Sequence, residues 1–197
     1  MADLAAPTPF AVAGIAGSLR TGSYNRALLR AAQELAPPAL FIEIHDLAGI
    51  PLYNEDVEKA GAPEPVARLR AAVGRADGLL IATPEYNHGM PGVLKNAYDW
   101  LSRPPRQSVL NGKPTAIMGA SPGMVGTARS QLQLRQSLAS TNTPALLQPE
   151  VLVGQAREKF DAAGRLTDEA TRKFLVLFLD HFVTWIARMK VKPGAGA

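Results

Sequence analysis

The chain has 197 residues, the size of one compact domain that can bury a sizeable core. Hydrophobic residues make up 47% and charged residues 19%, a balance typical of globular proteins and not of disordered or fibrous ones. Cysteine is absent, which excludes disulfides, iron–sulfur clusters and thiolate chemistry, and the net charge of +4 comes without the basic runs, interleaved with aromatics, that nucleic-acid binders show.

The first part of the chain predicts two strands and two helices. Residues 10–16 form a short apolar run, typical of a buried strand, and residues 25–35 carry apolar side chains along one helical face. Residues 40–44 alternate as a second strand, and residues 65–75 have the spacing of a second helix. Between them, the connection of residues 46–62 is long for a stretch without regular structure, which indicates a function or an interface.

The middle of the chain continues the alternation. Residues 78–83 are another buried apolar run and predict a third strand. Pro91 suits the first turn of a helix that continues to residue 101, because a helix start does not need the missing N–H. A fourth strand is expected over residues 115–120, followed by an amphipathic helix over residues 128–138.

The last part predicts one more strand and a long helix. The apolar stretch of residues 145–153 is interrupted by a proline, and the final helix covers residues 168–189 with Thr167 as its N-cap. Charged residues interrupt this helix, and its apolar part is shorter than the roughly 18 residues of a membrane span. We expect residues 1–9 and 191–197 to be loose, and the whole chain to form one domain.

Five apolar strands alternating with helices predict a doubly wound α/β fold, in which helices cover both faces of a five-stranded parallel sheet. A six-stranded dinucleotide-binding fold would need one more strand, and an eight-stranded barrel would need a longer chain. Ligands of doubly wound sheets bind beyond the carboxyl ends of the strands. The loops that follow the strands are therefore the candidate sites.

The loop of residues 17–25 has the composition of a phosphate site. A helix start presents unpaired N–H groups, Ser18, Thr21 and Ser23 add hydroxyls, and Arg20 adds a positive charge. The loop lacks the glycine fingerprints of nucleoside triphosphate and dinucleotide sites, which leaves a monophosphate as the expected ligand. A serine-capped helix start with a surface arginine would give the same pattern.

The loop of residues 83–92 is dense in turn-forming residues around an aromatic, an acid and an amide. Pro84 and Pro91 stiffen it, so its backbone groups can hydrogen-bond the edge of a planar heterocycle while Tyr86 packs beside the ring. His88 is expected to be a hydrogen-bonding loop residue and not a base. The three histidines are scattered along the chain, so no metal site is expected.

A third loop, residues 120–126, opens the next helix and meets the other two loops at the same edge of the sheet. Its Ser121 is not expected to be a hydrolase nucleophile, because the chain has no G-x-S-x-G elbow.

Together these loops resemble those of the NAD(P)H-dependent FMN reductase family of flavodoxin-like proteins, which includes quinone, azo-dye and chromate reductases. The resemblance runs from about residue 10 to residue 189. Its most specific pieces are GSLRTGSYN at residues 17–25, TPEYNHGMPGVLKNAYDW at residues 83–100 and SPG at residues 121–123.

The resemblance implies a bound FMN whose phosphate lies in the first loop and whose isoalloxazine ring lies against the second, with the third loop near the same ring. Tyr24 would contribute through its backbone. The implied flavin-binding residues are Ser18, Arg20, Ser23, Tyr24, Asn25, Pro84, Glu85, Tyr86, Asn87 and Ser121.

The implied reaction is a hydride transfer from NADPH or NADH to FMN, followed by electron transfer to a quinone, an azo compound or another small acceptor. No catalytic acid or base is expected, because the flavin carries the chemistry. Family members form homodimers that often pair into homotetramers, and residues 50–56 resemble the segment that reaches the neighbouring subunit. Arg129 and Glu150 resemble contacts between dimers, but Leu132 stands where a tyrosine is common, so dimer and tetramer both stay open.

Two other functions remain possible from the sequence. A flavodoxin-like electron carrier would bind FMN without turning over NAD(P)H, although such carriers are acidic and this chain has a charge of +4. The other possible function is that of a nucleotide-binding or scaffolding module that has lost its flavin. The electron acceptor, chromate included, and the preference for NADPH or NADH are undecided, and the expected location is the cytoplasm.

Overall fold

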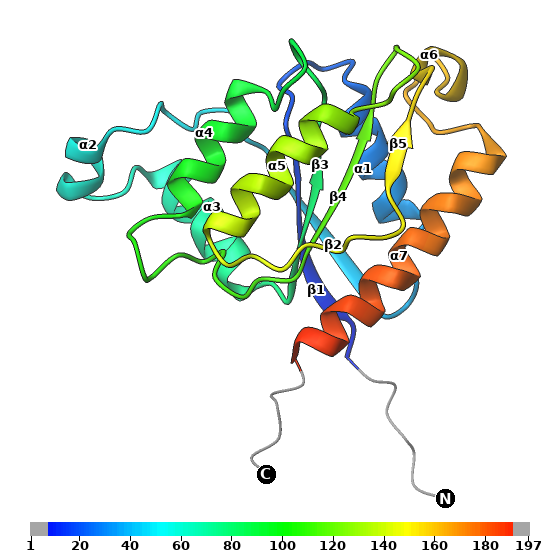
Figure 1. Cartoon of the computed structure of the whole chain (residues 1–197). Coiled ribbons are helices and arrows are strands. Elements are labelled where there is room, and N and C mark those ends of the chain that lie inside the picture. The colour runs from blue at the N-terminus through cyan, green and yellow to red at the C-terminus, as the bar shows by residue number, and fades with distance from the viewer. Residues whose placement is uncertain (1–7, 191–197) are drawn as a thin grey trace, which may run out of the picture.

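The computed structural model describes residues 8–190, in which five parallel strands form one sheet in the order β2-β1-β3-β4-β5 (Figure 1). This confirms the predicted doubly wound fold. The order reverses beside β1, which is the switch point where such sheets bind ligands. Of the ends expected to be loose, residues 1–7 and 191–197 lie outside the described residues. The strands are β1 (Phe10–Ala16), β2 (Leu40–His45), β3 (Gly78–Ala82), β4 (Thr115–Ala120) and β5 (Val151–Val153).

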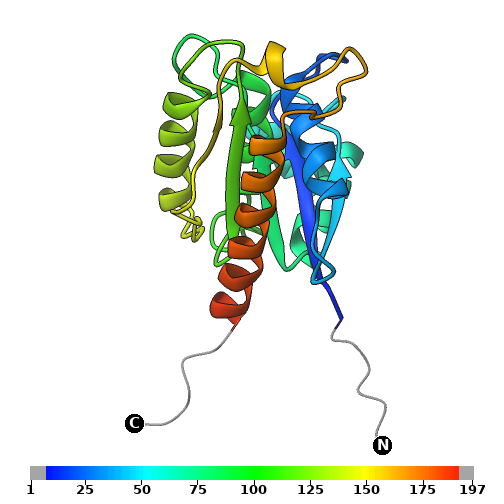
Figure 2. The same cartoon turned by 90° about the vertical axis from the view of Figure 1, so that its right-hand side faces the viewer.

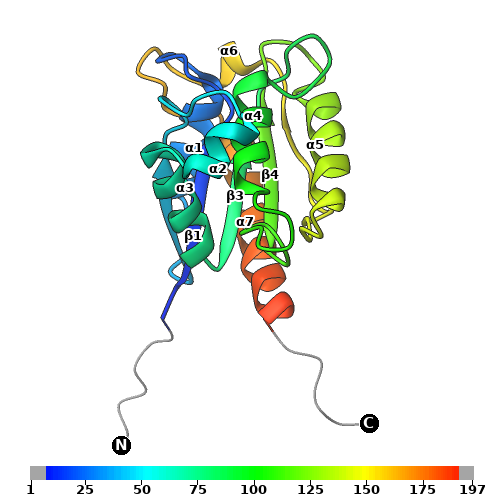
Figure 3. The ribbon, with the colours of Figure 1, turned by 90° about the vertical axis from the view of Figure 1, so that its left-hand side faces the viewer.

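Helices cover both faces of the sheet. Figure 2 shows α1 and α7 together on one face, and Figure 3 shows α3 and α4 on the opposite face, with α5 beside them. Within residues 8–190, no helix is long and apolar enough to cross a bilayer. The helices are α1 (Tyr24–Glu34), α2 (Glu55–Ala60), α3 (Glu64–Arg75), α4 (Gly92–Leu101), α5 (Ala128–Ser140), α6 (Ala156–Lys159) and α7 (Glu169–Lys190).

The strand sequences divide the core into two layers. In β3, Leu80 packs in the cluster that holds Phe178 and Phe182 of α7, whereas Leu79 and Ile81 pack in the cluster under α3, α4 and α5. Successive side chains of a strand point to opposite faces, so an uninterrupted apolar run is what a sheet covered on both sides requires.

The first residues after the strands are hydrogen-bonded to neighbouring strand ends. The N–H of Gly17 donates to the carbonyl of Ala82 at 2.9 Å, and the N–H of Ser121 donates to the carbonyl of Val153 at 2.9 Å. The loops predicted to carry the chemistry therefore leave the sheet from one edge, as parallel pairing demands.

Two expectations about irregular segments were wrong. The connection of residues 46–62 contains α2, whose start is capped by Asn54, with its Oδ1 accepting from the N–H of Asp56 at 2.8 Å. The apolar stretch of residues 145–153 forms a strand only over its last three residues, as β5. Pro149 has no N–H to donate to a ladder, which delays the start of the strand.

The expected N-cap of α7 was also wrong. Asp168 caps the helix, because its Oδ2 accepts from the N–H of Thr171 at 2.7 Å, whereas the hydroxyl of Thr167 donates to the carbonyl of Lys159 at 3.3 Å. The hydrogen bonds from Thr171 hold the pKa of Asp168 below its usual value. Thr167 is thus used to fasten the preceding loop.

Candidate functional site

The three loops surround one pocket at the carboxyl edge of the sheet, with about 340 Å³ of space including its mouth. Ala120 and Pro122 also line this pocket, and Asn87 does not. Side chains from three separate loops therefore converge, as the sequence predicted. The lining residues that were expected around a flavin are Ser18, Arg20, Ser23, Tyr24, Asn25, Pro84, Glu85, Tyr86 and Ser121.

The start of α1 forms the polar end of this pocket. Ser23 is the N-cap, and its hydroxyl accepts from the N–H of Arg26 at 3.4 Å. Among the described residues, nothing accepts from the N–H groups of Tyr24 and Asn25, and Arg20 is exposed and enters no ion pair. Two free N–H groups at a helix start beside a free guanidinium fit a phosphate monoester.

Two of the residues predicted at the phosphate end have their side chains occupied elsewhere. Both amide atoms of Asn25 bond the backbone of Ala120, with Nδ2 donating to its carbonyl at 2.8 Å and Oδ1 accepting from its N–H at 2.9 Å. The ring of Tyr24 packs against Phe160 with 5.5 Å between centroids. The backbone N–H is thus the group that each offers to an anion.

The second loop folds into a tight hairpin turn. Tyr86 and Gly89 exchange backbone hydrogen bonds of 3.1 and 3.0 Å, and the two residues between them, Asn87 and His88, have positive φ values of 52° and 63°. A two-residue turn of this kind requires left-handed backbone at both positions, which asparagine tolerates well. The turn holds the Tyr86 side chain, 47% exposed, at the rim of the pocket.

Glu85 joins the second loop to the start of α5. Its carboxylate accepts from the N–H of Arg129 at 2.9 Å, the N–H of Ser130 at 3.3 Å and the Arg129 guanidinium at 3.1 Å. Burial raises the pKa of the Glu85 carboxyl, but the hydrogen bonds from Ser130 and Arg129 outweigh burial and hold this pKa below its usual value. Glu85 is therefore an ionised anchor and not a proton donor.

Other residues of α5 support the second loop and were missed by the sequence analysis. The Ser130 hydroxyl hydrogen-bonds the Thr83 hydroxyl at 2.8 Å, and Oε1 of Gln133 accepts from the N–H of Met90 at 2.5 Å. In the sequence, Ser130 and Gln133 stand out only as polar residues three apart on a predicted helix. The same pattern is equally typical of a helix face that is exposed to solvent.

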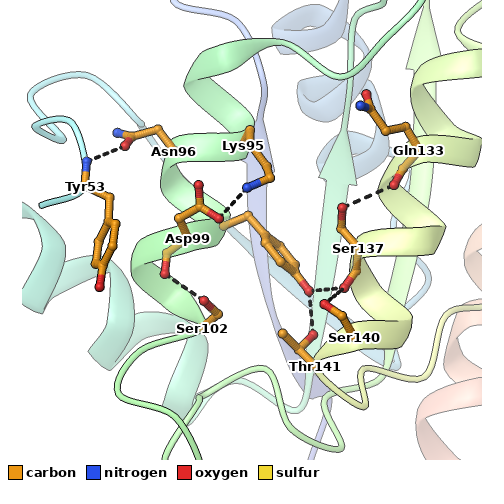
Figure 4. A network of polar contacts seen from close by, with 10 residues as sticks. Tyr53, Lys95, Asn96, Asp99, Ser102, Gln133, Ser137, Ser140 and Thr141 are labelled. Atoms are coloured by element: carbon orange, nitrogen blue, oxygen red, sulfur yellow. Dashed lines mark hydrogen bonds and ion pairs between the residues drawn. The ribbon is translucent and has the colours of Figure 1, made fainter. Parts of the chain in front are cut away.

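The long connection after β2 is fastened to α4 and carries α2 beyond the sheet (Figure 1). The Pro51 carbonyl accepts from Nε1 of Trp100 at 2.8 Å and from Nδ2 of Asn96 at 2.9 Å. Oδ1 of Asn96 accepts from the N–H of Tyr53 at 2.8 Å (Figure 4). This connection, residues 46–62, is called the arm below. Its hydrogen bonds to α4 fix it in place, and the side chain of Leu52, between the bonded residues Pro51 and Tyr53, is 83% exposed.

A polar network joins α4 to α5 (Figure 4). The Tyr98 hydroxyl donates to the carbonyl of Ser137 at 2.5 Å and hydrogen-bonds the Thr141 hydroxyl at 2.5 Å. Burial raises the pKa of Tyr98. Because α5 supports the second loop, this network also fixes the loop relative to α4.

The two residues expected between dimers have partners within the chain. Arg129 pairs with Glu85 as described, and the Glu150 carboxylate lies 3.8 Å from the Arg135 guanidinium. Neither side chain needs a second copy to balance its charge.

The third loop contributes Ser121 to the lining of the pocket. The hydroxyl of Ser121 accepts from the N–H of Gly123 at 3.1 Å, and no histidine lines the pocket. The Glu85 carboxylate also lines the pocket and is engaged by Arg129 and Ser130.

Sequence comparisons find relatives along almost the whole chain. The family model for NADPH-dependent FMN reductase matches residues 10–158. An NAD(P)H-dependent FMN reductase of Pseudomonas aeruginosa is 51% identical over 179 residues, which covers 91% of this chain and 96% of that protein. A 2-hydroxy-1,4-benzoquinone reductase of a Burkholderia species is 43% identical over 180 residues, covering 91% and 98%. The quinone reductase of Escherichia coli K12 is 40% identical over 183 residues, covering 91% and 97%.

Solved structures agree in fold. The flavoenzyme NAD(P)H:(acceptor) oxidoreductase FerB from Paracoccus denitrificans superimposes with a TM-score of 0.84 and 41% identity, covering 91% of this chain and 98% of that one. The apo form of the NADH:FMN oxidoreductase EMOB reaches a TM-score of 0.67 at 22% identity, covering 93% and 92%, which is a likeness of fold alone.

Proposed function

The chain belongs to the NADPH-dependent FMN reductase family, and we propose that it is an FMN-containing oxidoreductase that takes a hydride from NADPH or NADH and reduces quinones, azo compounds or chromate-like oxidants. The observation that carries the proposal is the pocket in which a helix start with free N–H groups and Arg20 faces the stiff loop of Pro84 and Tyr86. A pocket with a site for a phosphate at one end and a site for a flat ring at the other suits FMN.

The residues divide by role within this proposal. The FMN phosphate would lie at Ser18, Arg20 and Ser23 with the N–H groups of Tyr24 and Asn25, and the isoalloxazine ring would lie at Pro84, Glu85, Tyr86 and Ser121. Asn87 contributes the left-handed turn that sets the position of Tyr86. When bound, FMN supplies the hydride acceptor and the electron donor of the reaction.

The protein contributes position and electrostatics to this chemistry. Because Glu85 and the α5 start anchor the second loop, the ring-binding groups are held before the ligand arrives, which lowers the entropic cost of binding and alignment. The positive charge of Arg20 favours a phosphorylated flavin over riboflavin. We place the activity in the cytoplasm, with its supply of reduced nicotinamide nucleotides.

A homodimer is the proposed assembly. The arm is fastened to α4 and exposes two apolar side chains close together in the sequence, Leu52 and Val57, which a partner could remove from water. A second copy of the chain would cover them and bring the arm toward the neighbour's flavin site. The in-chain pairing of Arg129 and of Glu150 favours the dimer over the tetramer.

The test is a visible spectrum of the purified protein with and without added FMN, followed by anaerobic addition of NADPH or NADH. The expected result is bleaching of the bound-flavin band and its recovery on adding a quinone such as menadione. Binding of FMN without bleaching by either nucleotide would replace the reductase with an electron carrier. Absence of flavin binding would overturn the assignment of all three loops.

A further inference from the structure

A second and larger pocket lies across the first loop from the flavin pocket, between α1 and the end of β2. It encloses about 780 Å³ including its mouth, against about 340 Å³ for the flavin pocket. Ser18 lines both pockets, and none of the other expected flavin contacts lines this one. The proposed function gives this pocket no role.

The floor of this pocket is apolar. It is formed by Ala16 at the end of β1, Leu29 on α1 and Ile44 on β2. Leu29 is fully buried, whereas 37% of the Ile44 surface stays exposed. An apolar floor with a partly exposed branched side chain suits a flat ring, which would remove that surface from water.

The rim of the pocket carries an excess of positive charge. The guanidinium of Arg26 pairs with the Asp46 carboxylate at 3.0 Å, and that carboxylate also accepts from the N–H of Ala48 at 3.0 Å. Arg30, one helical turn after Arg26, is exposed and enters none of the ion pairs within residues 8–190. The pocket therefore offers one unbalanced arginine to an anion.

The place of these groups in the fold indicates the ligand. In related doubly wound folds that carry the dinucleotide fingerprint, an acid near the end of the second strand takes the ribose 2′-hydroxyl of NADH, and a nearby arginine takes the 2′-phosphate of NADPH. This chain lacks that fingerprint, so only the local chemistry at the end of β2 is comparable. Here Asp46 is the residue directly after β2, but it is occupied by Arg26, while Arg30 remains available. The site thus lacks the free carboxylate for NADH and has the free cation for NADPH.

We propose that this pocket receives the phosphorylated adenosine end of NADPH, with the ring on the apolar floor and the 2′-phosphate at Arg30. The inference rests on the proposed function for the role of NADPH. Because Ser18 borders both pockets, a dinucleotide lying over the first loop has one end at each. Arg30 then sets the preference for NADPH over NADH.

The direct test is calorimetric titration of the FMN-loaded protein with adenosine 2′,5′-bisphosphate, with 5′-AMP and inorganic phosphate as comparison ligands. Loading with FMN keeps these probes out of the flavin pocket. The expected result is one site that binds the bisphosphate about tenfold or more tighter than 5′-AMP, which lacks the 2′-phosphate and its charge-assisted contact, and tighter than inorganic phosphate, which lacks the ring that the apolar floor buries. Equal affinity for the bisphosphate and 5′-AMP, or no binding, would overturn the proposal.

A pair of variants locates the site. Arg30→Gln is expected to weaken bisphosphate binding about tenfold or more and to leave 5′-AMP binding unchanged. Arg188→Gln is the control, because it removes the same charge from an exposed helical position in the last turn of α7. Equal bisphosphate binding by the two variants would contradict the assignment of Arg30.

Kinetics of the same variants separate this inference from the proposed function. Arg30→Gln should raise KM for NADPH about tenfold or more and leave KM for NADH and FMN binding unchanged. If Arg30→Gln leaves KM for NADPH and KM for NADH both unchanged, the proposed reductase function stands and this inference is wrong. If neither nucleotide reduces the flavin, the titrations still report whether the pocket binds the phosphorylated adenosine.

Discussion

The side chain of Asn25 and the backbone of Ala120 form a closed pair of hydrogen bonds, one of 2.8 Å and one of 2.9 Å, between positions 95 residues apart. Asn25 is 2% exposed and Ala120 is 3% exposed. The pair ties the first turn of α1 to the end of β4. Because the first and third loops leave the fold at these two points, Asn25 sets the distance between them.

Replacing this asparagine should destabilise the whole fold. In Asn25→Ala both buried Ala120 groups lose their partner, so we expect the free energy of unfolding to fall by about 2–4 kcal/mol, measured by urea denaturation. Gln33→Ala is the control, since Gln33 lies on the same helix and makes a single hydrogen bond, to the carbonyl of Ile42. Equal losses in the two variants would contradict the special role of Asn25.

Arg20 should separate phosphorylated from unphosphorylated flavin. We expect Arg20→Ala to raise the Kd for FMN about tenfold or more, because a charge-assisted contact with the phosphate is lost, and to leave the Kd for riboflavin unchanged. Quenching of flavin fluorescence measures both. A parallel loss of affinity for riboflavin would mean that Arg20 shapes the loop and does not bind the phosphate.

The sheet and the position of the site follow from local sequence patterns. Buried strands such as β3 are uninterrupted apolar runs, and the first loop combines a serine cap, hydroxyls and an arginine at a helix start. Since parallel strands end at one edge, these local patterns also place the loops together. The start and end of most elements were therefore predicted to within about two residues.

The supports of the site could not be predicted in the same way. The contacts of Asn25 with Ala120 and of Glu85 with Arg129 join positions 95 and 44 residues apart, and a single sequence has no periodic signal for such pairs. The prediction of Thr167 as the N-cap of α7 was wrong for a local reason. Thr167 and Asp168 are both good capping residues, and the turn after Lys159 determines which of the two is free to cap the helix.

Gly119 should tolerate no side chain. A Cβ at this position in β4 would overlap Oγ1 of Thr127 and lie 2.5 Å from the carbonyl oxygen of Thr83. We expect Gly119→Ala to lower the free energy of unfolding by about 3 kcal/mol or more, because backbone of the second loop must move. Gly92→Ala is the control, since a Cβ there meets nothing within 4 Å. A stable Gly119→Ala protein with unchanged FMN affinity would contradict the tight packing.

The arm offers a test of the proposed dimer. Leu52→Asp places a charge on an 83% exposed apolar side chain of the arm, and we expect it to shift the protein from dimer to monomer in light scattering. Leu147→Asp changes a leucine of comparable exposure, 68%, near β5 and should leave the dimer intact. Dissociation by Leu147→Asp alone would move the interface to the β5 side.

Glu85 should give the stability of the protein a defined pH dependence. Its pKa is held below the ordinary 4.5 by the hydrogen bonds from Ser130 and Arg129, and its side chain is 10% exposed. The ionised carboxylate at the start of α5 therefore stabilises the folded state at pH values above 4.5, and this contribution disappears as the pH falls through the lower folded-state pKa. Glu85→Gln removes the charge at every pH.

We therefore expect Glu85→Gln to be less stable than the natural protein by about 1–3 kcal/mol at pH 7, and the two stabilities to converge below pH 4.5. Urea denaturation across pH 3–8 measures the difference. Glu64→Gln is the control, because that side chain is 66% exposed and its pair with Arg68 is a surface pair that contributes little. A stability difference between Glu85→Gln and the natural protein that stays constant from pH 8 to pH 3 would show that the amide loses shape or packing at α5 and that the charge of Glu85 does not hold the second loop.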